Sequence, residues 1–139
     1  MIKPTGITPE IISTLGNNEV FVFGSNLAGR HGGGAARTAL KWGAVMGQGV
    51  GLQGQTYAIP TMFDTTGEIQ PYVTEFINFA KSHPEYRFLV TKIGCGIAGF
   101  SITEIAELFR PVILEQIQNI SLPIEFVNAL VMGENNGED

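Results

Sequence analysis

The sequence contains almost no cysteine and no long apolar run. Its single cysteine, Cys95, excludes an internal disulfide framework and is typical of a reducing compartment. No stretch approaches the roughly 18 to 20 apolar residues that span a membrane, and the first residues lack the basic and apolar pattern of a secretory signal. We therefore expect a soluble, cytoplasmic protein without a membrane partner.

Basic residues are also scarce. Eight Lys and Arg stand against 13 Asp and Glu, which gives a formal net charge of −5, and Glu134, Glu138 and Asp139 concentrate acid near the C-terminus. A protein that binds duplex nucleic acid normally carries a basic face. The balance argues against a duplex nucleic acid partner and favours a small anionic ligand held mainly by main-chain N–H groups.

The length and the apolar patterns predict one α/β domain over residues 1–132, followed by an acidic polar tail over 133–139. The predicted helices cover 8–16, 34–42, 69–82 and 102–119, and the predicted strands cover 19–23, 55–60, 87–93 and 123–130. Pro71 is expected in the first turn of the third helix, and Ser101 with Glu104 forms a capping box for the fourth. Alternating strands and helices favour a mainly parallel sheet with helices on both faces.

Glycine is the residue in excess, with 18 among 139 residues, about twice the usual share. The glycines gather in three clusters, over residues 24–34, 43–54 and 94–99. The first and third clusters each follow a predicted strand and precede a predicted helix, which is where open α/β sheets bind ligands. Because glycine has no Cβ, a phosphate or ribose could approach several free N–H groups there. The alternative is that the glycines only permit tight turns.

The middle cluster contains Gly49-Val50-Gly51-Leu52-Gln53-Gly54, which satisfies the G-x-G-x-x-G pattern of dinucleotide-binding folds. That pattern requires a preceding strand and a following helix. Here a helix precedes and a strand follows, so we interpret the segment as a flexible crossover.

Two motifs together resemble the macrodomain superfamily, which binds ADP-ribose. The stretch Val22-Phe23-Gly24-Ser25-Asn26, followed by Gly32-Gly33-Gly34-Ala35, is similar to the family's first signature, and Asn26 falls on its second asparagine. Ile93-Gly94-Cys95-Gly96-Ile97-Ala98-Gly99-Phe100 is similar to the second, in wording closest to the ADP-ribosyl glycohydrolase branch. The strand Gln55 to Pro60 also resembles the strand that lies between the two.

The resemblance implies a three-layer α/β/α fold and a partner that is ADP-ribose or an ADP-ribosylated substrate. It implies that Asn26 and the first loop bind the distal ribose and that the second loop wraps the diphosphate. The ligand-binding residues expected on this basis are Gly24, Ser25, Asn26, Gly32, Gly33, Gly34 and Ala35 in the first loop, and Gly94, Cys95, Gly96, Ile97, Ala98, Gly99 and Phe100 in the second. The family's N-terminal Gly-Asp-Ile, whose carboxylate reads adenine, has no match before Glu19. Ala98 stands where family members carry an acid or an aromatic residue.

We expect hydrolysis of an ADP-ribosyl linkage in protein, DNA or O-acetyl-ADP-ribose, with a non-catalytic binding module as the alternative. The catalytic candidates are Asn26, His31 and Asp64. The imidazole of His31 could exchange a proton near neutral pH, and Asp64 could supply a carboxylate after the strand that ends at Pro60. An ordinary loop histidine and a turn aspartate are the competing interpretations. Lys92 could supply a cation, and Cys95 is expected to allow tight packing rather than to act as a nucleophile. No residue spacing indicates a metal, and no cofactor is expected.

Overall fold

The fold is built on a five-stranded mixed sheet with the strand order β2-β3-β1-β4-β5. The computed structural model describes the backbone of residues 6–136 and the side chains of residues 6–132. The strands are β1 Glu19–Ser25, β2 Gly51–Gln53, β3 Thr56–Pro60, β4 Arg87–Val90 and β5 Ile120–Ser121. Central β1 is parallel to β3 and β4, β4 is parallel to β5, and only β2 runs antiparallel to its neighbour. The predicted α/β class and the mainly parallel sheet are confirmed.

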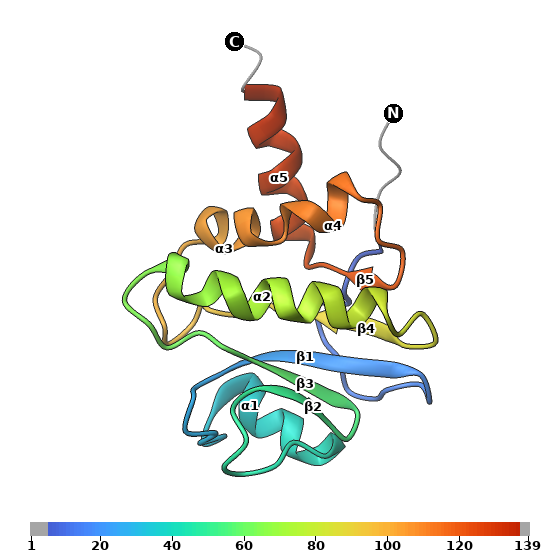
Figure 1. The fold of residues 1–139 in the computed structure, drawn as a ribbon, viewed down its shortest axis with the longest axis vertical. Helices are drawn as coiled ribbons and strands as arrows, with labels where there is room; N and C mark the ends of the chain where they lie inside the picture. The colour runs from blue at the N-terminus through green and yellow to red at the C-terminus, as the bar shows by residue number, and fades with distance from the viewer. Residues whose placement is uncertain (1–5, 137–139) are drawn as a thin grey trace.

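Helices lie on both sides of this sheet (Figure 1). Helix α1, Gly34–Ala39, continues as the 3₁₀ turn η1, Leu40–Trp42, and packs on one face. The opposite face carries α2 Thr66–Lys81, α3 Ile102–Leu108, α4 Arg110–Leu114 and α5 Ile124–Asn136. Among the residues described, no helix is both long and apolar enough to cross a membrane.

Strand β1 organises both cores because its side chains alternate between the two faces. Val20 and Val22 point into the larger cluster beneath α2, whereas Phe21 and Phe23 point into the smaller one beneath α1. All four are buried, and each contributes on the order of 2 kcal/mol through removal of apolar surface from water. Burial on both faces explains why the strand reads as a continuous apolar run.

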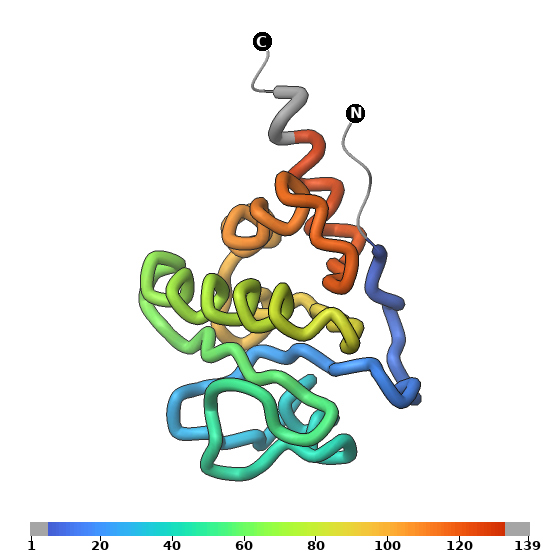
Figure 2. The backbone as a smooth tube through the Cα atoms, turned by 45° about the vertical axis from the view of Figure 1, so that its right-hand side comes forward, coloured from blue at the N-terminus to red at the C-terminus, as the bar shows by residue number. Residues whose placement is uncertain are grey.

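The predicted helix over residues 8–16 is wrong. Residues 6–8 instead extend the sheet edge beyond β5, where the Thr8 N–H donates to the Leu122 carbonyl at 2.8 Å and the Leu122 N–H donates to the Gly6 carbonyl at 3.0 Å. The chain then runs without helix to the start of β1 (Figure 2). Tertiary pairing has overridden the local capping pattern at Thr8 and Pro9, and Ile11 is left exposed.

The predicted strand over 123–130 is also wrong, because these residues begin helix α5. Phe126 and Leu130 are four residues apart and both buried, so a helix places them on one face toward the core. The actual last strand is the two-residue β5 just before. Helix α5 continues to Asn136 and so includes the first four residues of the predicted tail; the rest of that tail lies outside the described residues.

Three further boundaries differ from prediction. The helix predicted over 102–119 divides at Phe109 into α3 and α4, because Pro111 lacks the N–H that would continue the ladder. Helix α2 begins at Thr66 behind a Thr65–Glu68 capping box, which leaves Pro71 inside the helix beyond the first turn. Strand β4 ends at Val90 rather than residue 93, and the predicted crossover contains β2.

Candidate functional site

The two glycine loops meet at one edge of the sheet. Parallel strands β1 and β4 are neighbours, so the loops that follow them leave from adjacent carboxyl ends. At Thr91 both the N–H, at 3.1 Å, and the hydroxyl, at 2.8 Å, donate to the Val22 carbonyl. A Cβ built on Gly24 would lie 3.4 Å from the Gly94 nitrogen, so the loops touch where they leave the sheet.

A cavity of about 440 Å³ lies between these loops. It is lined by ten of the fourteen predicted ligand-binding residues, namely Gly24, Ser25, Asn26, Gly33, Gly34, Ala35, Gly94, Gly96, Ile97 and Ala98. The other four, Gly32, Cys95, Gly99 and Phe100, are not in its lining. The volume lies within the usual range for sites that bind nucleotides or other small molecules, roughly 300 to 1,000 Å³.

Five glycines, Gly24, Gly33, Gly34, Gly94 and Gly96, contribute main chain to the cavity wall. A Cβ built on Gly33, Gly34 or Gly96 would have no heavy atom within 4 Å, so the space beside these glycines is open. Gly34 has φ +58°, a backbone conformation that suits glycine and strains other residues. The loops therefore leave room for a ligand to approach the backbone itself.

Asn26 fixes the shape of the first loop. Its side-chain oxygen accepts the Arg30 N–H at 2.9 Å, and its side-chain NH₂ donates to the Arg30 carbonyl at 3.0 Å. This reciprocal pair closes a short turn, as local side-chain bonds of asparagine commonly do. Asn26 thus lies at the cavity while its amide also holds the loop that presents Arg30.

The charge of the lining is positive. Arg30 and Lys92 both line the cavity, and no carboxylate lies among its described lining residues. This contrasts with the chain as a whole, which carries a net charge of −5. A site with two cations and open main-chain N–H groups is suited to an anion such as a phosphate or diphosphate.

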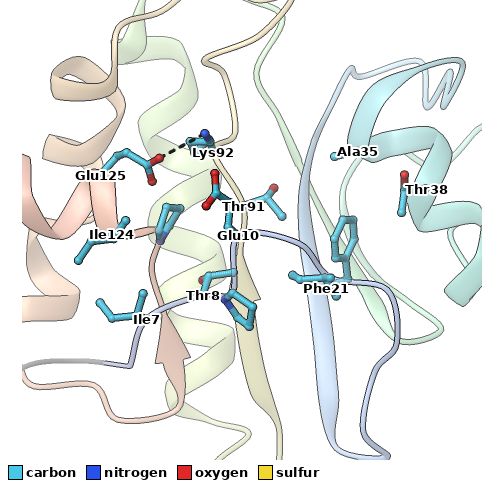
Figure 3. Close-up of a pocket in the computed structure, with 13 residues that line it drawn as sticks. Ile7, Thr8, Glu10, Phe21, Ala35, Thr38, Thr91, Lys92, Ile124 and Glu125 are labelled. Carbon is cyan, nitrogen blue, oxygen red and sulfur yellow. Dashed lines mark hydrogen bonds and ion pairs between the residues drawn. The ribbon is translucent and has the colours of Figure 1, made fainter.

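Figure 3 shows a second cavity, of about 490 Å³. The two share Ala35, Thr91 and Lys92, so part of their wall is common. The walls of the second come from the N-terminal segment, from Phe21 of β1 and from the start of α5. Its lining includes the carboxylates of Glu10 and Glu125 and the hydroxyl of Thr8, a residue only 6% exposed whose Oγ1 has no hydrogen-bond partner among the described residues.

His31 does not face either cavity. Its side chain is 1% exposed and packs edge-on against Phe23, with ring centroids 5.2 Å apart. The Nε2 atom lies 2.9 Å from the Val45 carbonyl oxygen and 3.1 Å from that of Gln48. Because a carbonyl can only accept, Nε2 carries the proton and donates to both. The structure places this residue as an anchor between two loops rather than at the cleft.

Asp64 and Cys95 also lie outside the lining of both cavities. Asp64 is exposed in the turn before α2 and lines neither cavity. Burial raises the pKa of the Cys95 thiol, only partly offset by Lys92, and its Sγ lies 3.8 Å from the Ser101 carbonyl oxygen. A raised pKa disfavours the thiolate, so Cys95 is a poor nucleophile.

The cavity contains several residues that the sequence did not single out. Arg30, Ala36, Thr61, Met62, Thr91 and Ile93 join the predicted set. Thr61 directly follows β3, the parallel neighbour of β1 on its other side, and its N–H donates to the Ser25 carbonyl at 2.9 Å. The position of Thr61 directly after a strand could have indicated a site residue. That indication becomes usable only when the strand order places β3 beside β1.

Within residues 6–132, no group of three or more His, Cys, Asp or Glu side chains is placed to hold a metal ion. A scan against protein-family models, a search of curated proteins and a search of solved structures found no match for this chain. The geometry of the cleft is therefore the basis for any functional assignment.

Proposed function

We propose that this chain binds ADP-ribose or a closely related nucleotide diphosphate in the cleft between its two glycine loops, as a domain of the three-layer macrodomain type. The observation that carries the proposal is the lining itself: open main chain from two adjacent parallel strands, together with Arg30 and Lys92 and no described carboxylate. This arrangement favours a compact anion over a long polyanion, because the positive charge is confined to one pocket.

The proposed ligand extends from the first cavity into the second, past the residues that line both. The diphosphate lies against residues 94–98, where Gly96 leaves open space beside the main chain, and the distal ribose lies beside Gly33 and Gly34. The second cavity then receives the nucleoside end, with Phe21 as an apolar wall and Glu10 on its lining. Glu10 supplies a carboxylate acceptor on a segment where the sequence motifs offered no match.

Binding is the function we propose, ahead of hydrolysis. Cleavage of an ADP-ribosyl linkage by acid–base catalysis needs a group that exchanges a proton near the reacting atoms. His31 and Asp64 lie outside the cleft, and the ionisable side chains of its described lining are Arg30 and Lys92. The expected hydrolysis therefore becomes an outcome to be tested. Release of ADP-ribose from a modified protein would favour hydrolysis over binding alone.

Isothermal titration calorimetry with ADP-ribose, ADP and adenosine tests the proposal. Arg30→Gln should weaken ADP-ribose and ADP binding by about tenfold, the order expected for one charge-assisted hydrogen bond, and should leave adenosine unchanged. Arg37→Gln is the matched control, since Arg37 is an exposed cation of α1 that lines neither cavity. Absence of binding by the unmodified chain, or an equal effect of both variants, would overturn the proposal.

A further inference from the structure

Lys92 occupies the boundary between the two cavities. It follows β4 in the chain, and it lines both the glycine-loop cavity and the second cavity. In the structure its Nζ lies 3.3 Å from Oε2 of Glu125, in the first turn of α5 (Figure 3). Glu125 lines the second cavity only. Arg30 and Lys92 are the two cations available to an anion in the first cavity, and Lys92 is thus already paired with Glu125, a carboxylate that lines the second cavity.

The ion pair between Lys92 and Glu125 can separate at little cost in free energy. The side chains are 48% and 40% exposed, and an exposed ion pair of this kind contributes little to stability. Lysine carries a point charge on a flexible four-carbon stem, so its ammonium can turn from one partner to another without movement of the backbone. A hydrogen bond with the backbone of Glu125 itself lowers the pKa of the Glu125 carboxyl; burial opposes this effect and Lys92 adds to it. The first of these causes does not depend on Lys92, so the carboxyl stays ionised when Lys92 leaves.

We propose that Lys92 is an exchangeable cation, released from Glu125 when an anionic ligand enters the glycine-loop cavity, and that Glu125 thereby sets the affinity of that cavity for anions. The inference rests on the proposed function. In this proposal Glu125 competes with the ligand, because the Glu125 carboxylate and the ligand's diphosphate bind the same Lys92 ammonium group. An uncharged ligand makes no such demand on Lys92.

The test is a double-mutant cycle with three probes: ADP-ribose, inorganic pyrophosphate and adenosine, each titrated by calorimetry. Glu125→Gln should tighten ADP-ribose and pyrophosphate by about two- to fivefold, the span of an exposed ion pair, and should not change adenosine. In a Lys92→Met background the same substitution should have much less effect, because the contested ammonium group is gone. Thermal melts of all variants establish that each is folded.

Glu115→Gln provides the matched control. Glu115 pairs with Lys81 at 2.9 Å, with side-chain exposures of 49% and 47%, and neither residue lines a cavity. This variant changes the net charge by the same amount but should leave all three affinities as they are. Equal gains from both glutamine variants would overturn the inference, because a general charge effect would then explain them.

Two other results would also be decisive. If Glu125→Gln tightens anions just as much in the Lys92→Met background, Glu125 repels the ligand directly and the exchange is wrong while the proposed function stands. If the unmodified chain binds neither ADP-ribose nor pyrophosphate, the proposed function fails and this inference falls with it.

Discussion

Two neighbouring glycines in the first loop should respond differently to the same substitution. Gly33 precedes α1 with φ −159°, an extended conformation that any residue adopts, whereas Gly34 has φ +58°. Neither position crowds an added methyl group, since no heavy atom lies within 4 Å of a Cβ built there. The variants Gly33→Ala and Gly34→Ala therefore differ mainly in backbone strain, within one loop and with identical composition.

The size of the difference follows from the backbone. A left-handed conformation costs an L-residue about 1 to 2 kcal/mol, while replacing any glycine recovers about 0.4 to 1 kcal/mol from the unfolded chain. At Gly33 that recovery is offset by the poor quality of alanine as an N-cap, so the free energy of unfolding should stay within about 0.5 kcal/mol of the parent chain. At Gly34 the same recovery is subtracted from the strain, so Gly34→Ala should be the less stable of the two variants by about 1 kcal/mol.

Urea unfolding followed through Trp42 measures this difference directly. Trp42 is the single tryptophan, and its ring packs against Phe21 with centroids 5.0 Å apart, so its fluorescence reports on the α1 face of the sheet. The two variants should show equal slopes and different midpoints. Equal midpoints, or a less stable Gly33→Ala, would refute the assignment of strain to Gly34 and with it the described shape of the loop.

Two further predictions concern buried side chains. His31→Ala should lower the free energy of unfolding by about 2 to 4 kcal/mol, because it removes a buried ring and takes from the Val45 carbonyl its side-chain donor, while the Gln48 carbonyl keeps the Gln53 amide as a second donor. An unchanged urea midpoint would contradict the anchoring role. Burial, followed by the charge of Glu75, raises the pKa of Tyr57 to about 12 from 10.0. Between pH 10 and 12 the folded protein therefore keeps the Tyr57 proton, whereas the unfolded chain has lost it. The neutral phenol contributes on the order of 2 kcal/mol to the free energy of unfolding below pH 10, and this contribution should be lost as the pH rises toward 12. Tyr57→Phe should lack this loss between pH 10 and 12 in melts across that range, and an identical decline in both proteins would refute it.

The parts of the site that could be predicted from sequence are those encoded locally. A strand that ends in glycine before an apolar helix is a short-range signal, and both glycine loops were identified by it. That the loops share one cavity followed from a parallel sheet, because β1 and β4 need only be neighbours for their ends to meet. Ten of the predicted ligand-binding positions therefore line one cavity.

The parts that could not be predicted depend on contacts between distant residues. His31 looked available because it lies among glycines, yet its partners are the carbonyl groups of Val45 and Gln48, 14 and 17 residues further along the chain. The second cavity exists because Ile7 pairs with Leu122 across almost the whole sequence, which brings Glu10 toward the sheet edge. No local pattern encodes either contact.

The predicted final strand failed for a related reason. In Pro123 to Leu130 the buried positions Phe126 and Leu130 fit helical spacing, but a short apolar run of this kind cannot be assigned to strand or helix by periodicity alone. Helix α5 forms because it can lie across α3 and close the larger core. The error matters for function, since the start of this helix carries Glu125.

The central claim is that main-chain N–H groups of both glycine loops receive one anionic ligand. Titration of ¹⁵N-labelled protein with ADP-ribose, followed by amide chemical shifts, tests it most directly. The account predicts that the largest changes fall on Gly33, Gly34, Gly94 and Gly96 and saturate together at a single dissociation constant. Changes confined to one loop, or centred elsewhere on the molecule, would contradict it.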